Sequence, residues 1–330
     1  MIPLLLQAAE PPFQGAGEFS ALGGAFVWAI ASILYAKSFK NSNPNDAVWF
    51  KNFVSTVVLG GIALAIGKDY GGGLPAADEF GWILGSGLFG MWIGDWMYFV
   101  AISHIGVGRS VILTMATPAL TAIFAWLMFG EALIFGQWIG ILCVVGGSIL
   151  VEARRHESTA AQTEPAAPAA TEGSATTATA HTPKGSKKIG YLACLTATFS
   201  WTVSNLLIHN GLGETGAVTG GALRLAAGTF GFAVWFLSHG QLGQKMRKLG
   251  TLDSWRKFAI PTFLGTVVGM SLYVAGFKWA PQGVAASLAS TVPLFALPLS
   301  IWLLKEKSSW RGWIGSSVVV IGVFLVGKVL

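Results

Sequence analysis

The sequence contains many separate apolar runs, each close to the length that crosses a lipid bilayer. A membrane-spanning α-helix needs about 20 consecutive apolar residues, because the hydrocarbon core is about 30 Å thick. Hydrophobic residues make up 53% of the chain and charged residues only 11%, against about a quarter charged in ordinary globular domains. A soluble fold of 330 residues has too little interior to bury that much apolar surface. We therefore expect an all-α membrane protein.

Polar turns divide these runs into ten predicted transmembrane helices, whose ends are defined to within about 2–4 residues. The predicted helices span residues 19–37, 46–67, 80–102, 108–129, 134–151, 189–209, 217–238, 257–278, 283–304 and 309–328. Residues 152–188 are rich in Ala, Thr and Pro without apolar periodicity, which predicts a disordered linker. Residues 1–18 have no basic residue before their short apolar stretch, so we expect an N-terminal tail rather than a signal peptide.

The two sides of this linker, residues 19–151 and 189–330, are copies of one another. The first two helices of each copy align at an offset of 173 residues, and the later helices align at 175. The matched pairs include Trp28 with Trp201, Lys51 with Arg224, Gly90 with Gly265, Tyr98 with Tyr273 and Pro118 with Pro293. Five helices per copy is an odd number, so the second copy must enter the membrane from the opposite side. The sequence therefore predicts two inverted five-helix repeats, an arrangement typical of transporters that alternate access to a midplane site.

Several motifs in this order resemble the EamA-like family of the drug/metabolite transporter superfamily. They are FVWAIAS in the first helix, a basic residue early in the second, GMWIGDWMYFVAI in the third, FGEAL after the fourth and QWIGILCVVGG in the fifth. The resemblance covers both halves and excludes only the tail and the linker. It implies ten helices, a central cavity lined mainly by helices 1, 3, 4, 6, 8 and 9, and transport of metabolites such as amino acids.

The basic residues indicate how the chain is oriented. Sixteen Lys and Arg residues lie at loops on one face, including the linker, whereas three lie on the face that carries both termini. The positive-inside rule then places the linker in the cytoplasm of a cell with an inner membrane and both termini in the periplasm. The sequence pI of 9.4 is explained by these loops, so we expect no nucleic-acid partner.

Asp95 is the one acidic residue well inside a predicted span. A charge at that depth costs several kcal/mol unless it is paired or hydrated. Two interpretations stay open: a structural ion pair with Lys51, which lies about as deep from the same face, or a cavity-lining group that binds a cation or cycles a proton. Met270 stands at the corresponding position of the second half. Such an asymmetric charge is more typical of substrate recognition than of a scaffold.

The candidate substrate-binding residues are deep aromatic or polar side chains on helices that the resemblance assigns to the cavity. Aromatic walls suit flat or amphipathic solutes, and a side-chain amide is costly to leave unpaired in an apolar interior. With Asp95, the predicted set is Trp28, Tyr98, Thr114, Trp201, Asn205, Tyr273 and Ser290. Most hydroxyls in membrane helices simply bond back to their own backbone.

These features favour a secondary transporter of a small metabolite, working by alternating access with a proton or a counter-substrate as the candidate coupling partner. No Walker-type loop is present, and Cys143 and Cys194 lie inside apolar runs, so we expect no cofactor, metal site or disulfide framework. The alternatives are a membrane channel and, less favoured, a membrane-embedded enzyme. Trp92 occupies the first glycine position of the GxGD motif of intramembrane aspartyl proteases, so we expect no catalytic residues. The sequence does not predict the substrate, the direction of transport or the oligomeric state.

Overall fold

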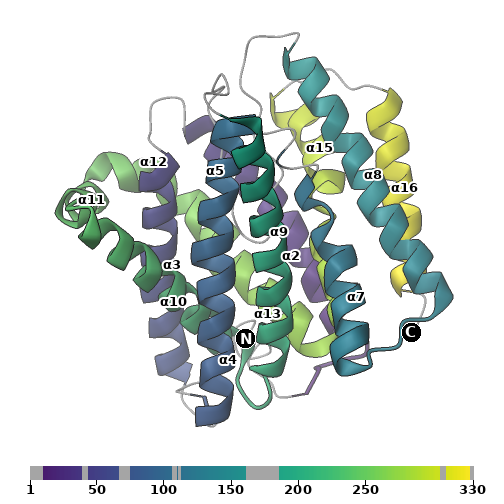
Figure 1. The fold of residues 1–330 in the computed structure, drawn as a ribbon, viewed down its shortest axis with the longest axis horizontal. Coiled ribbons are helices and arrows are strands. Elements are labelled where there is room, and N and C mark those ends of the chain that lie inside the picture. Colours follow the sequence, from purple (N-terminus) through teal and green to yellow (C-terminus); the bar gives the residue numbers. More distant parts are fainter. Residues whose placement is uncertain are drawn as a thin grey trace.

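The structure is a computed structural model and describes residues 10–38, 44–66, 75–105, 110, 113–160, 186–304 and 310–327. This part of the chain consists of helices joined by short turns and irregular stretches, and it contains no β-strand (Figure 1). The first-half helices are α2 (Ala16–Ser38), α3 (Pro44–Ile66), α4 (Ala77–Gly87), η3 (Leu88–Gly94), α5 (Asp95–Ile105), α7 (Thr117–Phe129) and α8 (Phe135–Ala160). The second-half helices are α9 (Lys187–Asn210), α10 (Ala217–Ser238), α11 (Leu242–Leu249), α12 (Leu252–Thr262), η4 (Phe263–Val268), α13 (Gly269–Trp279), α14 (Gln282–Ala289), α15 (Val292–Leu304) and α16 (Trp310–Gly327).

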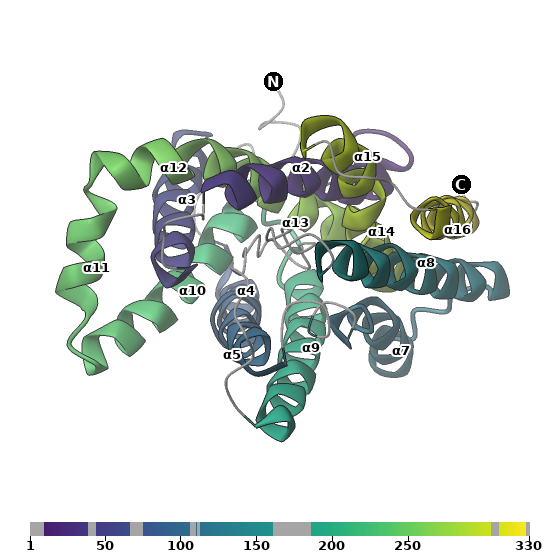
Figure 2. The same cartoon turned by 90° about the horizontal axis from the view of Figure 1, so that it is seen from above.

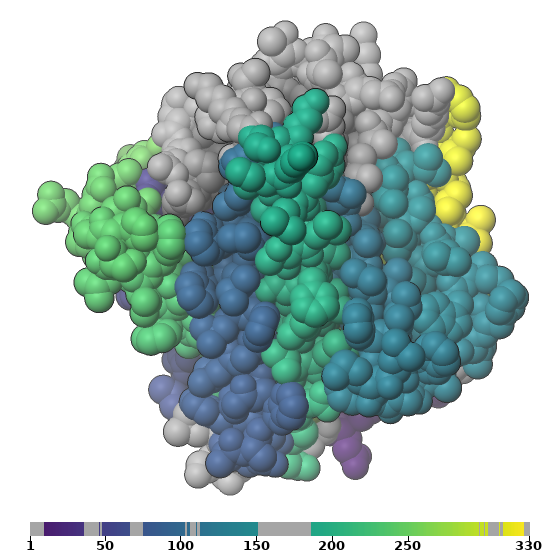
Figure 3. All heavy atoms as spheres, viewed as in Figure 1, coloured from purple at the N-terminus to yellow at the C-terminus, as the bar shows by residue number. Residues whose placement is uncertain are grey.

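Five of the described helical segments are long and apolar enough to cross a membrane, and shorter apolar helices accompany them. The outer surface is also apolar. On α9, for example, the side chains of Leu192, Leu195 and Phe199 are more than half exposed, and Figure 3 shows α9 open to the outside between the segment α4–α5 and the helix α7. An apolar exterior around helices whose backbone bonds are internal is typical of a multi-pass membrane protein.

The two halves pack into each other rather than side by side. The first helix of each half contacts the third helix of the other: α2 packs on α13 and η4, and α9 packs on α5 and η3. The second helices, α3 and α10, also pack together, as do the fifth helices, α8 and α16. Viewed from above, α11 lies at one edge of the molecule and α16 at the opposite edge (Figure 2). The interior is thus formed from both repeats.

Glycines let α8 and α16 approach closely. A Cβ atom built on Gly147 would lie 2.6 Å from the carbonyl oxygen of Gly315, and one on Gly322 would lie 2.7 Å from the carbonyl oxygen of Gly140. Gly140 and Gly147 match Gly315 and Gly322 at the 175-residue offset, so the two contacts are repeat equivalents. Small residues of this kind let membrane helices pack backbone to backbone.

The third helix of each half contains a π-helical segment, which the sequence analysis did not predict. Segment η3 begins at Leu88 and ends at Gly94, and η4 begins at Phe263, which matches Leu88 at the 175-residue offset. Each segment joins two α-helices end to end, so the predicted spans 80–102 and 257–278 are continuous but irregular. Irregular turns of this type are frequent at functional sites.

The predicted fourth and ninth helices, 108–129 and 283–304, are broken rather than kinked. Turns at residues 115–116 and at 290–291 interrupt them, and α7 and α15 restart directly afterwards. Pro118 and Pro293 lie in the first turn of the restarted helices. A proline is accommodated there because the first helical N–H groups have no intrahelical acceptor. The predicted continuous helices are therefore corrected to helices with a break in front of each proline.

The described backbone also changes the boundaries of the predicted tail and linker. Helix α2 begins at Ala16, inside the predicted tail 1–18. Helix α8 runs to Ala160, so residues 152–160 of the predicted linker 152–188 continue that helix, because the segment has no Gly or Pro before Pro165 to end it. Residues 161–185 lie outside the described part. The linker's last two residues belong to α9, which begins at Lys187.

Helix α11 was not predicted, because eight residues give too short a periodic run to distinguish from a basic loop. Two of its lysines hold it against the start of α3: the Nζ atoms of Lys245 and Lys248 lie 2.6 and 2.8 Å from the carboxylate oxygens of Asp46. Burial alone raises the pKa of the Asp46 carboxyl, but the hydrogen bonds from the two ammonium groups outweigh it and hold that pKa below its ordinary value.

The contact between α8 and α16 can be tested with neighbouring glycines. We expect Gly147→Ala to lower the free energy of unfolding by about 1–3 kcal/mol, because the new methyl group meets backbone atoms of α16 that cannot rotate away. Gly146, whose Cβ position is open, is the matched control, and Gly146→Ala should be neutral or stabilising by up to about 1 kcal/mol. Thermal unfolding in detergent measures both. Equal effects of the two substitutions would contradict the packing described above.

Candidate functional site

Two buried tryptophans tie the halves together at their centre. The indole Nε1 of Trp28, on α2, donates to the carbonyl oxygen of Gly265 in η4 at 2.6 Å. The repeat equivalent, Trp201 on α9, donates to the carbonyl oxygen of Gly90 in η3 at 3.2 Å. Each half therefore supplies a hydrogen bond to the π-helical segment of the other. The Gly90 carbonyl oxygen also accepts from the backbone N–H of Asp95, so the indole adds a donor from the opposite half to a carbonyl of the irregular helix. A hydrogen bond of this kind contributes about 0.5–1.5 kcal/mol.

The glycines of the third helices make room for these indole rings. A Cβ atom on Gly94 would lie 2.6 Å from Nε1 of Trp201, and one on Gly269 would lie 2.4 Å from Nε1 of Trp28. The two glycines match at the 175-residue offset, and each leaves space for a ring from the opposite half.

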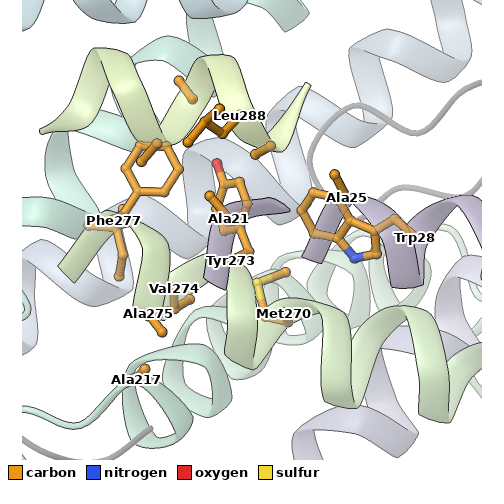
Figure 4. Close-up of a cluster of buried hydrophobic side chains, with 14 of the residues drawn as sticks. Ala21, Ala25, Trp28, Ala217, Met270, Tyr273, Val274, Ala275, Phe277 and Leu288 are labelled. Carbon is orange, nitrogen blue, oxygen red and sulfur yellow. The ribbon is translucent and has the colours of Figure 1, made fainter. Parts of the chain in front are cut away.

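Each tryptophan also packs against a tyrosine of the opposite half. The ring centroids of Trp28 and Tyr273 are 5.1 Å apart, and those of Trp201 and Tyr98 are 5.2 Å apart. Figure 4 shows Trp28 from α2 beside Tyr273 and Met270 from α13, with the Tyr273 hydroxyl turned toward the helix that carries Leu288. The four aromatic side chains are almost fully buried. They form two repeat-related pairs in the interior.

A small cavity lies where the broken helices meet the second-half core. Its volume is about 20 Å³, which is room for about one water molecule. The lining comes from α7, α9, α13 and α14 and consists of Thr117, Pro118, Asn205, Tyr273, Ala286, Ala289 and Ser290. These elements correspond to helices 4, 6, 8 and 9 of the predicted ten, which are among those that the family resemblance assigned to the cavity.

Polar side chains close one side of this cavity. The Tyr273 hydroxyl donates to Oδ1 of Asn205, and the Asn205 amide nitrogen lies 3.3 Å from the hydroxyl oxygen of Thr121. Ser290 donates to carbonyl oxygens of its own helix, those of Ala286 and Ser287. The amide of Asn205 therefore bonds to side chains of other helices, whereas the Ser290 hydroxyl bonds to the backbone of its own helix.

Asp95 and Lys51 form a buried ion pair in the first half. The Lys51 Nζ lies 3.6 Å from Asp95 Oδ2, and both side chains are at most 2% exposed. The other carboxylate oxygen, Oδ1, is 3.3 Å from Nε1 of Trp201. Trp201 thus contacts both the π-helical carbonyl of Gly90 and this carboxylate, so the ion pair is connected to the crossing between the halves.

The structure brings together only part of the predicted substrate-binding set. Asn205, Tyr273 and Ser290 line the cavity, and Trp28 packs on Tyr273. Asp95, Tyr98 and Trp201 form a separate cluster. Thr114 is buried in front of the break in the fourth helix, where its carbonyl oxygen accepts from the Thr117 hydroxyl at 2.8 Å. The predicted residues therefore fall into two repeat-related groups, and the cavity lies beside the second-half group.

Arg224 was missing from the predicted set, although the structure places it in the interior. It is fully buried on α10, and its Nη2 donates to the Ser204 hydroxyl at 2.6 Å. Its guanidinium carbon lies 5.1 Å from the centre of the Tyr273 ring. The sequence could have indicated this residue. Arg224 matches Lys51 in the repeat alignment, whereas Met270 stands at the position of Asp95, the partner of Lys51.

A second, more open pocket of about 410 Å³ lies at the end of the bundle opposite α11. Its carboxylate, Glu131, accepts from the backbone N–H of Gln282 at 2.9 Å and lies 3.7 Å from Nε2 of His209. These contacts connect the loop after α7 to the start of α14 and the end of α9. Among the described residues, no cluster of three His, Cys, Asp or Glu side chains can hold a metal ion here or elsewhere.

Comparison with known proteins identifies related chains. The sequence model described as the EamA-like transporter family matches residues 15–153 and again residues 188–328. Protein LicB of Haemophilus influenzae is 29% identical over 141 residues, which cover 42% of this chain and 46% of LicB, so less than half of that relative is matched. One crystal structure of a protein superposes with a TM-score of 0.67 over 96% of this chain and 98% of the other, at 14% identity, which shows a shared fold.

The ion pair generates a stability prediction. We expect Asp95→Asn to lower the free energy of unfolding by up to about 3–5 kcal/mol, because it leaves the buried Lys51 without its carboxylate partner. The charge-neutral double variant Lys51→Met, Asp95→Asn should recover most of that loss, since neither charge then needs compensation. Thermal unfolding in detergent compares the two. Equal stability of the single and double variants would contradict the pairing.

Proposed function

Because the chain belongs to the EamA-like transporter family, we propose that it is a secondary transporter of a small metabolite. The proposed substrate is an amino acid or a related amphipathic solute, and the proposed mechanism is alternating access through the central cavity. The residues proposed to contact the substrate are those that line the cavity or flank it, above all Asn205, Tyr273 and Trp28. The bilayer and the substrate are the proposed partners, with a proton or a counter-substrate as the coupling species.

The observation that carries this proposal is the position of the cavity at two repeat-equivalent helix breaks. Broken helices at mid-membrane typically form the substrate sites of transporters built from inverted repeats, because they present backbone and polar groups in an otherwise apolar interior. Here the break at residues 290–291 contributes Ser290 to the cavity, and Thr117 follows the break at 115–116. A rigid channel has no need of two interchangeable halves, so these features favour a carrier.

The proposed topology has ten membrane spans arranged as an inverted five-plus-five repeat. The five long apolar helices and the shorter ones support it, since each pair of helices joined end to end makes one span. The contacts of Trp28 and Trp201 support it further, because each is the image of the other with the halves exchanged.

The proposed orientation follows from the basic loops, among them the helix α11 with Lys245, Arg247 and Lys248. We expect a single cysteine introduced into the linker to react with a membrane-impermeant maleimide only after the inner membrane is opened, in a background where Cys143 and Cys194 are replaced. A cysteine at position 3 should react in intact spheroplasts. The reverse labelling pattern would overturn this orientation.

The function itself is tested by counterflow in liposomes. We expect the purified full-length chain to catalyse saturable counterflow of at least one solute from a panel of labelled amino acids, amides, amines and carboxylic acids. Unsaturable ion current would favour a channel instead, and saturable turnover without transport would favour an enzyme. The double variant Lys51→Met, Asp95→Asn is then assayed with the same solute. Wild-type counterflow in that variant at every pH would remove Asp95 from the transport mechanism.

A further inference from the structure

Arg224 is a buried cation whose surroundings are uncharged. Its side chain is fully buried in the middle of α10, among the η3, α9 and α13 elements. Among the described residues, no carboxylate forms an ion pair with it. Its partners are the Ser204 hydroxyl at 2.6 Å, the Met270 sulfur at 4.0 Å and the ring face of Tyr273. Its Nε–H has no hydrogen-bond acceptor.

The first half shows how the same position is neutralised. Lys51, the repeat equivalent of Arg224, lies 3.6 Å from the carboxylate of Asp95. The residue at the Asp95 position in the second half is Met270, and it indeed lies against Arg224. The second half therefore keeps the base and the geometry of the pair but lacks the acid.

An arginine in this position has no simple way to lose its charge. Its guanidinium stays protonated in proteins, whereas a buried lysine can release its proton. A buried charge without a counter-charge is costly in an apolar interior, and these three neutral contacts offset only part of that cost. A ligand that brings a negative charge would complete the set. The free Nε–H and an adjacent Nη group form the edge that binds a carboxylate with two parallel hydrogen bonds.

Arg224 also contacts residues that border the cavity. Tyr273 lines the cavity, and the guanidinium lies over the face of its ring. Ser204, whose hydroxyl accepts from Arg224, directly precedes the cavity residue Asn205. Side chains that contact the guanidinium therefore lie between it and the cavity, and they must move for a ligand's carboxylate to reach Arg224. The remaining lining of Pro118, Ala286 and Ala289 is small and apolar, which suits the carbon skeleton of a small solute.

We propose that Arg224 binds the carboxylate group of the transported substrate, so that the substrate class is a small carboxylic or amino acid. This inference rests on the proposed transport function and adds the group that is recognised. The acid that Met270 replaces in the second half is then supplied by the substrate, and the buried charge is fully compensated only when the substrate is bound.

The sharpest test restores the missing acid within the protein. Met270→Asp places a carboxylate beside Arg224, as Asp95 lies beside Lys51, and should compete with a substrate carboxylate for the guanidinium. We expect this variant to fold with an unchanged or raised midpoint of thermal unfolding and to lose counterflow of carboxylates about tenfold or more. Met270→Asn, which adds a polar group of the same shape without the charge, is the matched control and should keep most of the counterflow.

A second variant removes the cation itself. Arg224→Met replaces a buried charge by an apolar side chain of comparable length, a change that is often tolerated in folded proteins. It should reduce counterflow of carboxylates about tenfold or more, and it should abolish the preference of the wild-type chain for an amino acid over the corresponding amide. Leucine with leucinamide and phenylalanine with phenylalaninamide are suitable labelled pairs. Both variants are assayed as full-length protein in liposomes, after their unfolding midpoints show that they are folded.

The outcomes separate this inference from the transport function. No saturable counterflow of any solute by the wild-type chain would overturn both. Wild-type counterflow of amides or amines, but not of the matching acids, would overturn the role of Arg224 and leave a transporter. Carboxylate counterflow that is unchanged in folded Arg224→Met would do the same. Loss in Met270→Asp and Arg224→Met with retention in Met270→Asn would support the assignment.

Discussion

The hydrogen bonds from Trp28 and Trp201 to glycine carbonyls join the two repeats, and most of the interior is arranged around them. In the hydrocarbon core no water is available to bond to a backbone group, so a hydrogen bond from a neighbouring helix supports an irregular one. The π-helical segments η3 and η4 are irregular in this sense, and each receives an indole donor from the other half. The glycines at positions 94 and 269 must stay small to admit the rings. The aromatic pairs, the ion pair and the cavity all lie next to these contacts.

The repeat alignment predicts much of this arrangement, because it depends on residue identity at fixed offsets. Matching Trp28 with Trp201 and Tyr98 with Tyr273 from the sequence identified the four aromatic side chains that meet in the interior. The alignment does not say whether a residue contacts its own half or the opposite half. Trp28 pairs with Tyr273 rather than with Tyr98 of its own repeat, since the first helices cross over. The predicted binding set was therefore divided between two clusters instead of one.

Other features escaped prediction because hydropathy does not record them. The turn at 115–116 is Met-Ala, and the turn at 290–291 is only the two small residues Ser290 and Thr291, so a scan for apolar runs passes through both without a boundary. Pro118 and Pro293 were matched as a repeat pair, but a proline in a first helical turn and a proline at a kink look the same in sequence. Helix α11 is short and basic, and its position depends on a contact with Asp46 that lies 199 residues from Lys245. Arg224 was counted as a repeat match, and its significance comes from the acid that is missing opposite it.

The symmetry of the backbone contacts and the asymmetry of the charges have different consequences for transport. A cavity of about 20 Å³ holds no metabolite, so binding requires the surrounding helices to move. The two helix breaks are repeat equivalents, as are the two tryptophan contacts, so rearrangements at either end of the bundle would use the same local chemistry. The charges are not equivalent between the halves, because the Lys51–Asp95 pair has no net charge whereas Arg224 carries a positive charge. A carrier of this design would open to both sides by related movements, while the buried Arg224 would bind the substrate's carboxylate as proposed above.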